Sequence, residues 1–139
     1  MDAQQVKLVQ SSFAKVAPIS QVAANLFYTR LFELDPALRP MFRGPIEEQG
    51  RKLMQVLAVA VAALDNLEPL LPTVRALGTR HHAYGVKDQD YDTVAAALMW
   101  TLEQGLGEAF TPAVRAAWAE TYGLLSSVMK ASALGKEAA

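Results

Sequence analysis

Apolar residues recur at intervals of three and four along almost the whole chain. The first and last of these series are Val6, Val9, Phe13 and Val16, and Val114, Trp118, Tyr122, Leu125 and Met129. Each series keeps one apolar face at about 3.6 residues per turn, which is typical of an amphipathic helix. No window alternates between apolar and polar residues over the length of a strand. The pattern therefore predicts an all-α protein.

Prolines, glycines and acidic residues mark where the helices end and begin. Ser20, after Pro18, is expected to cap the second helix, and Asp35-Pro36 predicts a short helical turn. The stretch GVKDQD at 85–90 predicts a loop that ends in capping carboxylates. About six main helices and one short helix result. Their uneven lengths and irregular corners favour oblique packing over an up-down bundle.

Length and composition indicate one domain. The chain has 139 residues, of which 52% are hydrophobic, enough for a large core or an apolar pocket. We expect the domain to span 1–132. The remaining residues, 133–139, are small and polar, and we expect them to form a frayed tail.

Charge and cysteine content exclude several classes of function. A net charge of −1 gives no reason to expect nucleic acid or an anionic membrane as a partner. The absence of cysteine excludes disulfides, thiolate metal sites and covalent haem attachment. The N-terminal residues do not resemble a signal peptide, and the apolar run at 56–64 is too short to cross a bilayer. We therefore expect a cytoplasmic protein without membrane insertion.

The only two histidines, His81 and His82, are adjacent. His81 continues the apolar stripe of its helix, and His82 falls on the polar side. His81 is therefore either a core histidine bonded to a carbonyl or a ligand facing a pocket. Adjacent residues of one helix cannot bind opposite sides of one iron. If His81 binds a haem iron, no second histidine of this chain occupies the opposite position.

Two polar residues, Tyr28 and Gln49, lie on apolar stripes of other predicted helices. A buried polar group without a partner costs roughly 1–3 kcal/mol, so each needs one. In one interpretation, the Tyr28 hydroxyl bonds a carbonyl and Gln49 is partly exposed. In the other, both side chains face His81 across a pocket.

Several segments at fixed spacing resemble one family. These are FYTRLFELDPALRPMF at 27–42, Gln49 with Leu53, RHHAYGV at 80–86 and AWAETYG at 117–123. The chain resembles a bacterial single-domain globin over nearly its whole length. It is similar to bacterial haemoglobins and to the globin domain of flavohaemoglobins. Through GRKLMQVL at 50–57 it looks closest to the globin of thermoacidophilic methanotrophs. The resemblance implies the globin fold, a three-on-three helical sandwich.

The resemblance also implies a role for ten residues around haem b. His81 looks like the proximal ligand of the iron, and Tyr28 and Gln49 look like the distal groups that act on a bound gas. The remaining haem contacts would come from Phe42, Lys52, Leu53, Leu77, Arg80, Val86 and Tyr91. Lys52 and Arg80 would pair with the propionates, although both also suit ordinary solvated cations.

One departure from the family concerns the residues behind His81. Relatives often place a tyrosine and a glutamate there. Tyr91 matches the tyrosine, but Ala133 stands at the second position and no carboxylate lies between Glu120 and Glu137. Without a carboxylate at that position, His81 would donate less electron density to a haem iron, which disfavours a peroxidase-like role.

The resemblance implies reversible, high-affinity O₂ binding at a pentacoordinate iron, with NO and CO as further ligands. Hydrogen bonds from Tyr28 and Gln49 would slow O₂ release. Slow release suits nitric oxide detoxification, a dioxygenation to nitrate, better than oxygen transport. Because the chain carries no dinucleotide fingerprint, we expect electrons from an unidentified external reductase. A haem-based gas sensor, an electron-transfer globin and a haem-free helical interaction protein are the alternatives.

Overall fold

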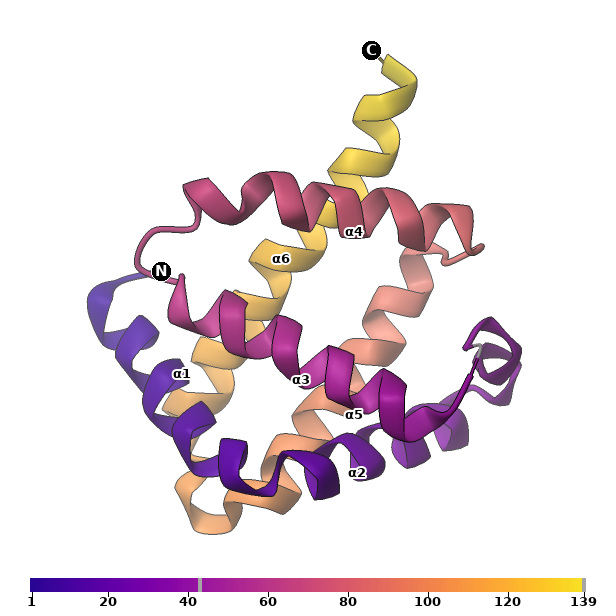
Figure 1. Ribbon diagram of the computed structural model, residues 1–139. Coiled ribbons are helices and arrows are strands. Elements are labelled where there is room, and N and C mark those ends of the chain that lie inside the picture. The colour runs from indigo at the N-terminus through magenta and orange to yellow at the C-terminus, as the bar shows by residue number, and fades with distance from the viewer. Residues whose placement is uncertain (43, 139) are drawn as a thin grey trace.

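The computed structural model describes residues 1–42 and 44–138, with side chains in the last helix as far as residue 132. Within these ranges the chain forms helices and no strand, which confirms the all-α prediction. The α-helices are α1 (Ala3–Val16), α2 (Ser20–Leu34), α3 (Ile46–Ala62), α4 (Leu71–Ala83), α5 (Asp88–Leu106) and α6 (Pro112–Ala138) (Figure 1). Short 3₁₀ helices join them: η1 (Ala17–Ile19), η2 (Pro36–Met41), η3 (Glu68–Leu70) and η4 (Gly107–Ala109). The one short helix predicted at Asp35-Pro36 is η2.

Acidic side chains set two of the predicted boundaries. The Asp35 carboxylate accepts a hydrogen bond from the Ala37 amide at the start of η2, at 3.1 Å. The Asp90 carboxylate accepts one from the Lys87 amide at 2.9 Å, at the start of α5. Both satisfy amide groups that a helix start leaves without partners.

The prediction that Ser20 caps α2 is wrong. Ser20 is the first residue of α2, Ile19 precedes it, and no side chain caps this end. The chain passes from α1 to α2 through the single turn of η1, which contains Pro18. A continuous helical path leaves no extended residue to act as a cap.

The end of α6 bears on the predicted frayed tail. The helix runs to Ala138, but the side chains of residues 133–139 lie outside the described part of the chain. The division into a domain at 1–132 and a tail at 133–139 stays a prediction.

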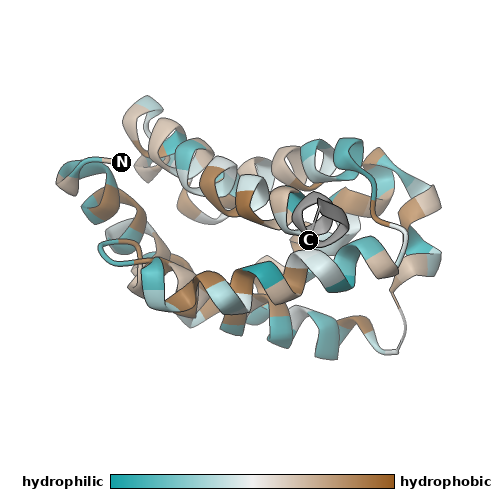
Figure 2. Cartoon of the chain, turned by 90° about the horizontal axis from the view of Figure 1, so that it is seen from above, coloured by the Kyte–Doolittle hydropathy of each residue, from teal (hydrophilic) through white to brown (hydrophobic). Residues whose placement is uncertain are grey.

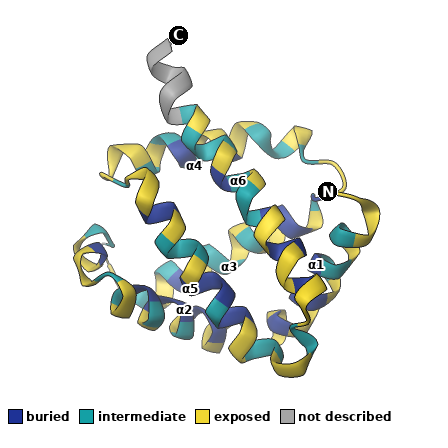
Figure 3. Ribbon diagram, turned by 180° about the vertical axis from the view of Figure 1, so that it is seen from behind, coloured by how far each residue is buried: buried dark blue, intermediate teal, exposed yellow. Residues whose placement is uncertain are grey.

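The helices pack in two layers with their hydrophobic faces turned inward (Figure 2). α4 and α1 pack against α6, while α2 packs against α3 and α5. Seen from behind, the buried positions follow the inner sides of the helices (Figure 3). Trp118 on α6 is 1% exposed, and its ring nitrogen donates a hydrogen bond to the Ser12 hydroxyl on α1 at 2.8 Å. This bond joins the first and last helices inside the core.

Two helix crossings depend on glycine because the backbones approach closely. A Cβ on Gly50 of α3 would lie 2.8 Å from the Cβ of Ala24 on α2. A Cβ on Gly78 of α4 would meet the backbone of Met129 on α6, with the Met129 Cα at 2.6 Å. Real Cβ atoms do not come this close to other heavy atoms. Any larger residue at Gly78 must therefore push α4 away from α6.

Gly78→Ala should destabilise the protein by about 1–3 kcal/mol, because overpacking outweighs the gain of about 1 kcal/mol in helix propensity. Urea unfolding followed by circular dichroism measures the difference. Gly123→Ala is the matched control, since a Cβ at Gly123 on α6 meets nothing within 4 Å. We expect this control to be neutral or stabilising. Equal stability changes in the two variants would contradict the packing argument.

Candidate functional site

α3 and α4 cross the same side of the molecule, one above the other (Figure 1). α3 packs against α2 and α1, whereas α4 packs against α6. Large apolar side chains on both helices stay only half-buried, among them Leu53 and Leu77. Val56 and Val59 on α3 are 43% and 55% exposed. Apolar surface that is left incompletely covered in this way is typical of the wall of a ligand site.

His81 and His82 lie in the last turn of α4 and differ in burial, as their spacing predicts. His81 is half-buried and His82 is exposed. The Nδ1 atom of His81 is buried and makes no hydrogen bond of good geometry. Burial lowers the pKa of His81 from its usual 6.5, the Leu77 carbonyl one turn earlier opposes the shift, and the charge of Arg80 adds to it. The imidazole is therefore neutral at pH 7, which is the form that binds metals.

Tyr28 on α2 and Gln49 at the start of α3 lie next to each other. Tyr28 is 5% exposed, and its hydroxyl donates a long hydrogen bond of 3.4 Å to the backbone carbonyl of Gln49. The close approach of Gly50 to Ala24 brings the two helices together at this point. The Tyr28 hydroxyl thus meets a backbone carbonyl, that of Gln49. That both side chains face His81 across a pocket stays a prediction. The Gln49 residue is itself half-buried.

Burial keeps the Tyr28 hydroxyl protonated. It raises the pKa of Tyr28 from 10.0 to about 12. A neutral phenol donates a hydrogen bond, and a bond of 3.4 Å is at the weak end of the normal range. The hydroxyl can therefore turn from the carbonyl to a better acceptor at small cost.

Phe42 follows η2 and completes an aromatic cluster around Tyr28. The ring centroids of Phe42 and Tyr28 are 5.3 Å apart in an edge-to-face arrangement, and Phe42 lies 5.5 Å from Phe32. Phe27 meets Tyr28 edge-on at 5.0 Å. Such contacts restrict the motion of the Tyr28 ring. The structure thus brings together Tyr28, Gln49 and Phe42, three of the predicted site residues.

Tyr91 on α5 lies behind His81. The two rings meet edge-on with centroids 6.4 Å apart. The Tyr122 hydroxyl on α6 donates a hydrogen bond to the Tyr91 carbonyl at 2.7 Å. The Lys130 ammonium, also on α6, lies 5.3 Å from the centroid of the Tyr91 ring. Lys130 was not among the predicted site residues, although it lies one helical turn before Ala133, where relatives often place a glutamate.

The remaining predicted residues take simpler positions. Val86 is half-buried, and its amide donates to the carbonyl of His81 at 3.0 Å. Leu53 and Leu77 are half-buried, and Lys52 and Arg80 are exposed. Contact of these five residues with a cofactor stays a prediction.

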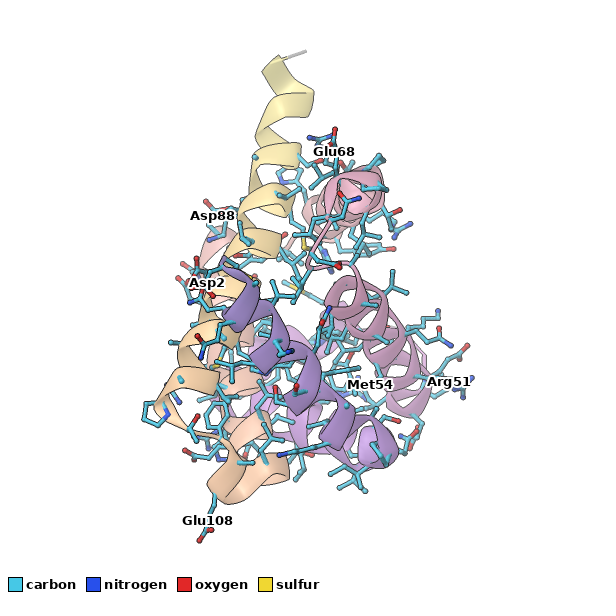
Figure 4. All side chains as sticks on the ribbon, turned by 90° about the vertical axis from the view of Figure 1, so that its left-hand side faces the viewer. Asp2, Arg51, Met54, Glu68, Asp88 and Glu108 are labelled. Atoms are coloured by element: carbon cyan, nitrogen blue, oxygen red, sulfur yellow. The ribbon has the colours of Figure 1, made fainter. Side chains whose placement is uncertain are left out.

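A separate groove between α1, α2 and α3 does not contain these residues. It encloses about 260 Å³ and is lined by Phe13, Gly50, Arg51 and Met54 among others. Figure 4 shows Met54 on the side of α3 that faces α1 and Arg51 projecting away from it. Neither His81 nor Tyr28 lines this groove, so it is distinct from the predicted site.

The residues at the predicted site fit a haem. His81 offers a neutral imidazole whose Nδ1 lies near a backbone carbonyl, an arrangement that leaves Nε2 available to a metal. Half-buried leucines on α3 and α4 offer apolar surface to a flat ring. Tyr28 offers one hydroxyl donor. Within the described ranges, no helix is both long and apolar enough to cross a membrane.

Comparisons with known proteins agree on one family. The family model described as Globin matches residues 25–129. Neuroglobin of Danio rerio is 35% identical over 136 residues, covering 88% of this chain and 86% of that protein. A flavohemoprotein of Bacillus subtilis is 26% identical over 129 residues, covering 91% of this chain but 32% of that protein. An engineered carbene transferase, made from a candidate nitric oxide dioxygenase of Rhodothermus marinus, superposes with a TM-score of 0.89 at 25% identity, covering 99% of this chain and 96% of that one.

The buried hydroxyl of Tyr28 should make stability depend on alkaline pH. Folding raises the pKa of Tyr28 from 10.0 to about 12. The contribution of the protonated hydroxyl to the unfolding free energy is therefore complete below pH 10 and is lost as the pH rises through 12. Between these values the unaltered chain should lose about 2 kcal/mol more unfolding free energy than Tyr28→Phe. Urea titrations at several pH values measure this. Tyr84→Phe, at a tyrosine that is 63% exposed, should follow the unaltered chain. Parallel curves for all three proteins would contradict the prediction.

Proposed function

The chain belongs to the globin family, and from that premise we propose that it binds O₂ reversibly and with high affinity on a pentacoordinate haem b. We further propose that the bound gas serves nitric oxide detoxification, with electrons from an external reductase. The comparisons support the globin fold and, through the family, a haem cofactor. The likeness to globins of methanotrophs stays a prediction.

The observation that supports this function best is the buried hydroxyl of Tyr28 beside Gln49. A haem held there would supply an iron able to bind O₂ and CO and to be oxidised as NO is converted to nitrate, so each turnover would require one electron. Tyr28 holds its proton well above neutral pH and can donate it in a hydrogen bond. The side-chain amide of Gln49 offers a second donor from the first turn of α3. Both act on a ligand that carries partial negative charge.

The remaining residues would hold the cofactor and exclude water. The neutral imidazole of His81 is the proposed ligand of the iron. Leu53, Leu77 and Val86 would cover the faces of the ring, and Phe42 would stack on it beside Tyr28. The exposed cations Lys52 and Arg80 would pair with the propionates at the edge of the site. Two likenesses support the proposed use: one to a flavohemoprotein, the other to a structure derived from a candidate nitric oxide dioxygenase.

The histidine pair provides a matched test of haem binding. His81→Ala should release haem at least about tenfold faster than the unaltered chain, because the iron loses its only histidine ligand. His82→Ala, at the exposed neighbour, should retain haem normally. Transfer of haem to an acceptor protein, followed by visible absorption, measures the rates.

Restoration of the spectrum of His81→Ala by added imidazole would show that the variant is folded. Equal rates of haem loss from the two variants would contradict the role of His81, whereas failure of the unaltered chain to bind haem would support the haem-free interaction protein.

Tyr28→Phe tests whether the hydroxyl holds the gas. The variant should release O₂ on the order of 10 to 100 times faster, because a charge-assisted hydrogen bond worth roughly 1.5–3 kcal/mol is lost. CO carries little negative charge, so its release should change much less. Stopped-flow displacement of each gas measures the rates in the same samples.

The reaction with NO tests the physiological use. NO added to the oxygenated protein should give nitrate and ferric haem in equal amounts at once. A stable oxygenated protein that yields no nitrate would overturn detoxification but not O₂ binding. Rapid oxidation in air alone would overturn both and favour a sensor or an electron-transfer globin.

A further inference from the structure

Lys130 places a positive charge behind the proposed iron ligand. Its ammonium lies 5.3 Å from the centroid of the Tyr91 ring. The Tyr91 ring in turn contacts the His81 ring, and the centroids of these two rings are 6.4 Å apart. The three side chains come from α6, α5 and α4. They form one connected row, from the half-buried residue Lys130 through the buried residue Tyr91 to the imidazole of His81.

The row is fixed by contacts on each of its helices. The Tyr122 hydroxyl donates a hydrogen bond of 2.7 Å to the Tyr91 carbonyl, which fixes α5 against α6. Thr79 and Ser132 share a hydrogen bond of 3.1 Å, and the Ser132 hydroxyl also donates to the Arg75 carbonyl at 2.8 Å. These bonds tie α4 to α6 near Lys130. The backbone of α6 at Lys130 is therefore held close to α4 and α5.

The face of the Tyr91 ring can bind a cation through a cation–π contact. An ammonium within about 6 Å of an aromatic centroid is attracted by the negative face of the ring. Tyr91 is buried, so the contact is partly shielded from water, and the charge is felt further than at an open surface.

We propose that Lys130 is a positioning residue, which acts through Tyr91 to hold a positive charge behind His81 and so favours ferrous over ferric iron. This inference rests on the proposed haem site. A positive charge near an iron opposes the gain of positive charge on oxidation. The charge and hydrogen bonding around a metal ligand are among the means by which a protein sets a reduction potential. A carboxylate in the same place would act in the opposite direction.

Two carboxylates near this row oppose Lys130, but they are better hydrated. Asp88 acts on Tyr91 and Asp92 acts on Tyr122, and both lie near the start of α5 with exposed side chains. Solvent and salt screen charges on exposed side chains more strongly than charges on half-buried residues such as Lys130. Lys130 adds to the positive charge of Arg80, which acts on His81 from the neighbouring position.

The test is a charge series at Lys130 in protein loaded with haem b. We expect the midpoint potential to fall in the order unaltered chain, K130M, K130E, with K130R close to the unaltered chain. By Coulomb's law, a unit charge on the order of 12 Å from an iron changes the ferrous-to-ferric ratio roughly threefold to tenfold at an effective dielectric constant of about 20 to 40. A tenfold change corresponds to about 59 mV for one electron. Spectroelectrochemical titration measures the potentials.

K15M provides the matched control, since Lys15 is an exposed lysine of α1. It should leave the potential unchanged. A normal haem spectrum with equal potentials in K130M, K130E and the unaltered chain would overturn this inference alone. A K130R potential that matches K130M would also overturn it, because the effect would then depend on shape. Absence of a haem spectrum in the unaltered chain would overturn the proposed function, and this inference with it.

Discussion

The position of His81 depends on the close crossing of α4 over α6. At this crossing Gly78 leaves no room between its backbone and that of Met129. The hydrogen bonds of Thr79, Ser132 and Arg75 strengthen the same contact. The other contacts of α4 include the short turn of η3 and, through His81, the Tyr91 ring of α5. One helix thus carries the candidate ligand while its other face remains available, since α3 does not pack along it.

The surroundings of Tyr28 on α2 show a second constraint, the burial of polar groups in an apolar setting. Tyr28 is surrounded by aromatic rings, and its hydroxyl has one long hydrogen bond to a backbone carbonyl. A core built only for stability would fill this position with phenylalanine, because a weakly bonded buried hydroxyl costs free energy. Sequences depart from the most stable choice mainly where a function requires it. The imidazole of His81, with its weakly bonded Nδ1, is the matching case on α4.

Much of this arrangement could be predicted from the sequence, because it depends on local periodicity. The helical repeat placed His81 inward and His82 outward, and the acidic residues at Asp35 and Asp90 marked real helix starts. The cap at Ser20 could not be predicted well, since a single 3₁₀ turn and an extended cap have similar sequences. Lys130 was missed for another reason. Its contact with Tyr91 joins residues on different helices, and only the packing of α5 on α6 brings them together.

The hydrogen bond between Trp118 and Ser12 has a consequence for how the chain acquires its fold. The two residues are separated by 106 positions in the sequence, yet their bond lies inside the core. α1 precedes the other described helices in the chain, and its inner face is fully covered only when α6 packs against it. Ordering so long a loop costs conformational entropy before the contact is gained. Because α4 packs on the same helix, α6 is needed to complete both the core and the candidate site.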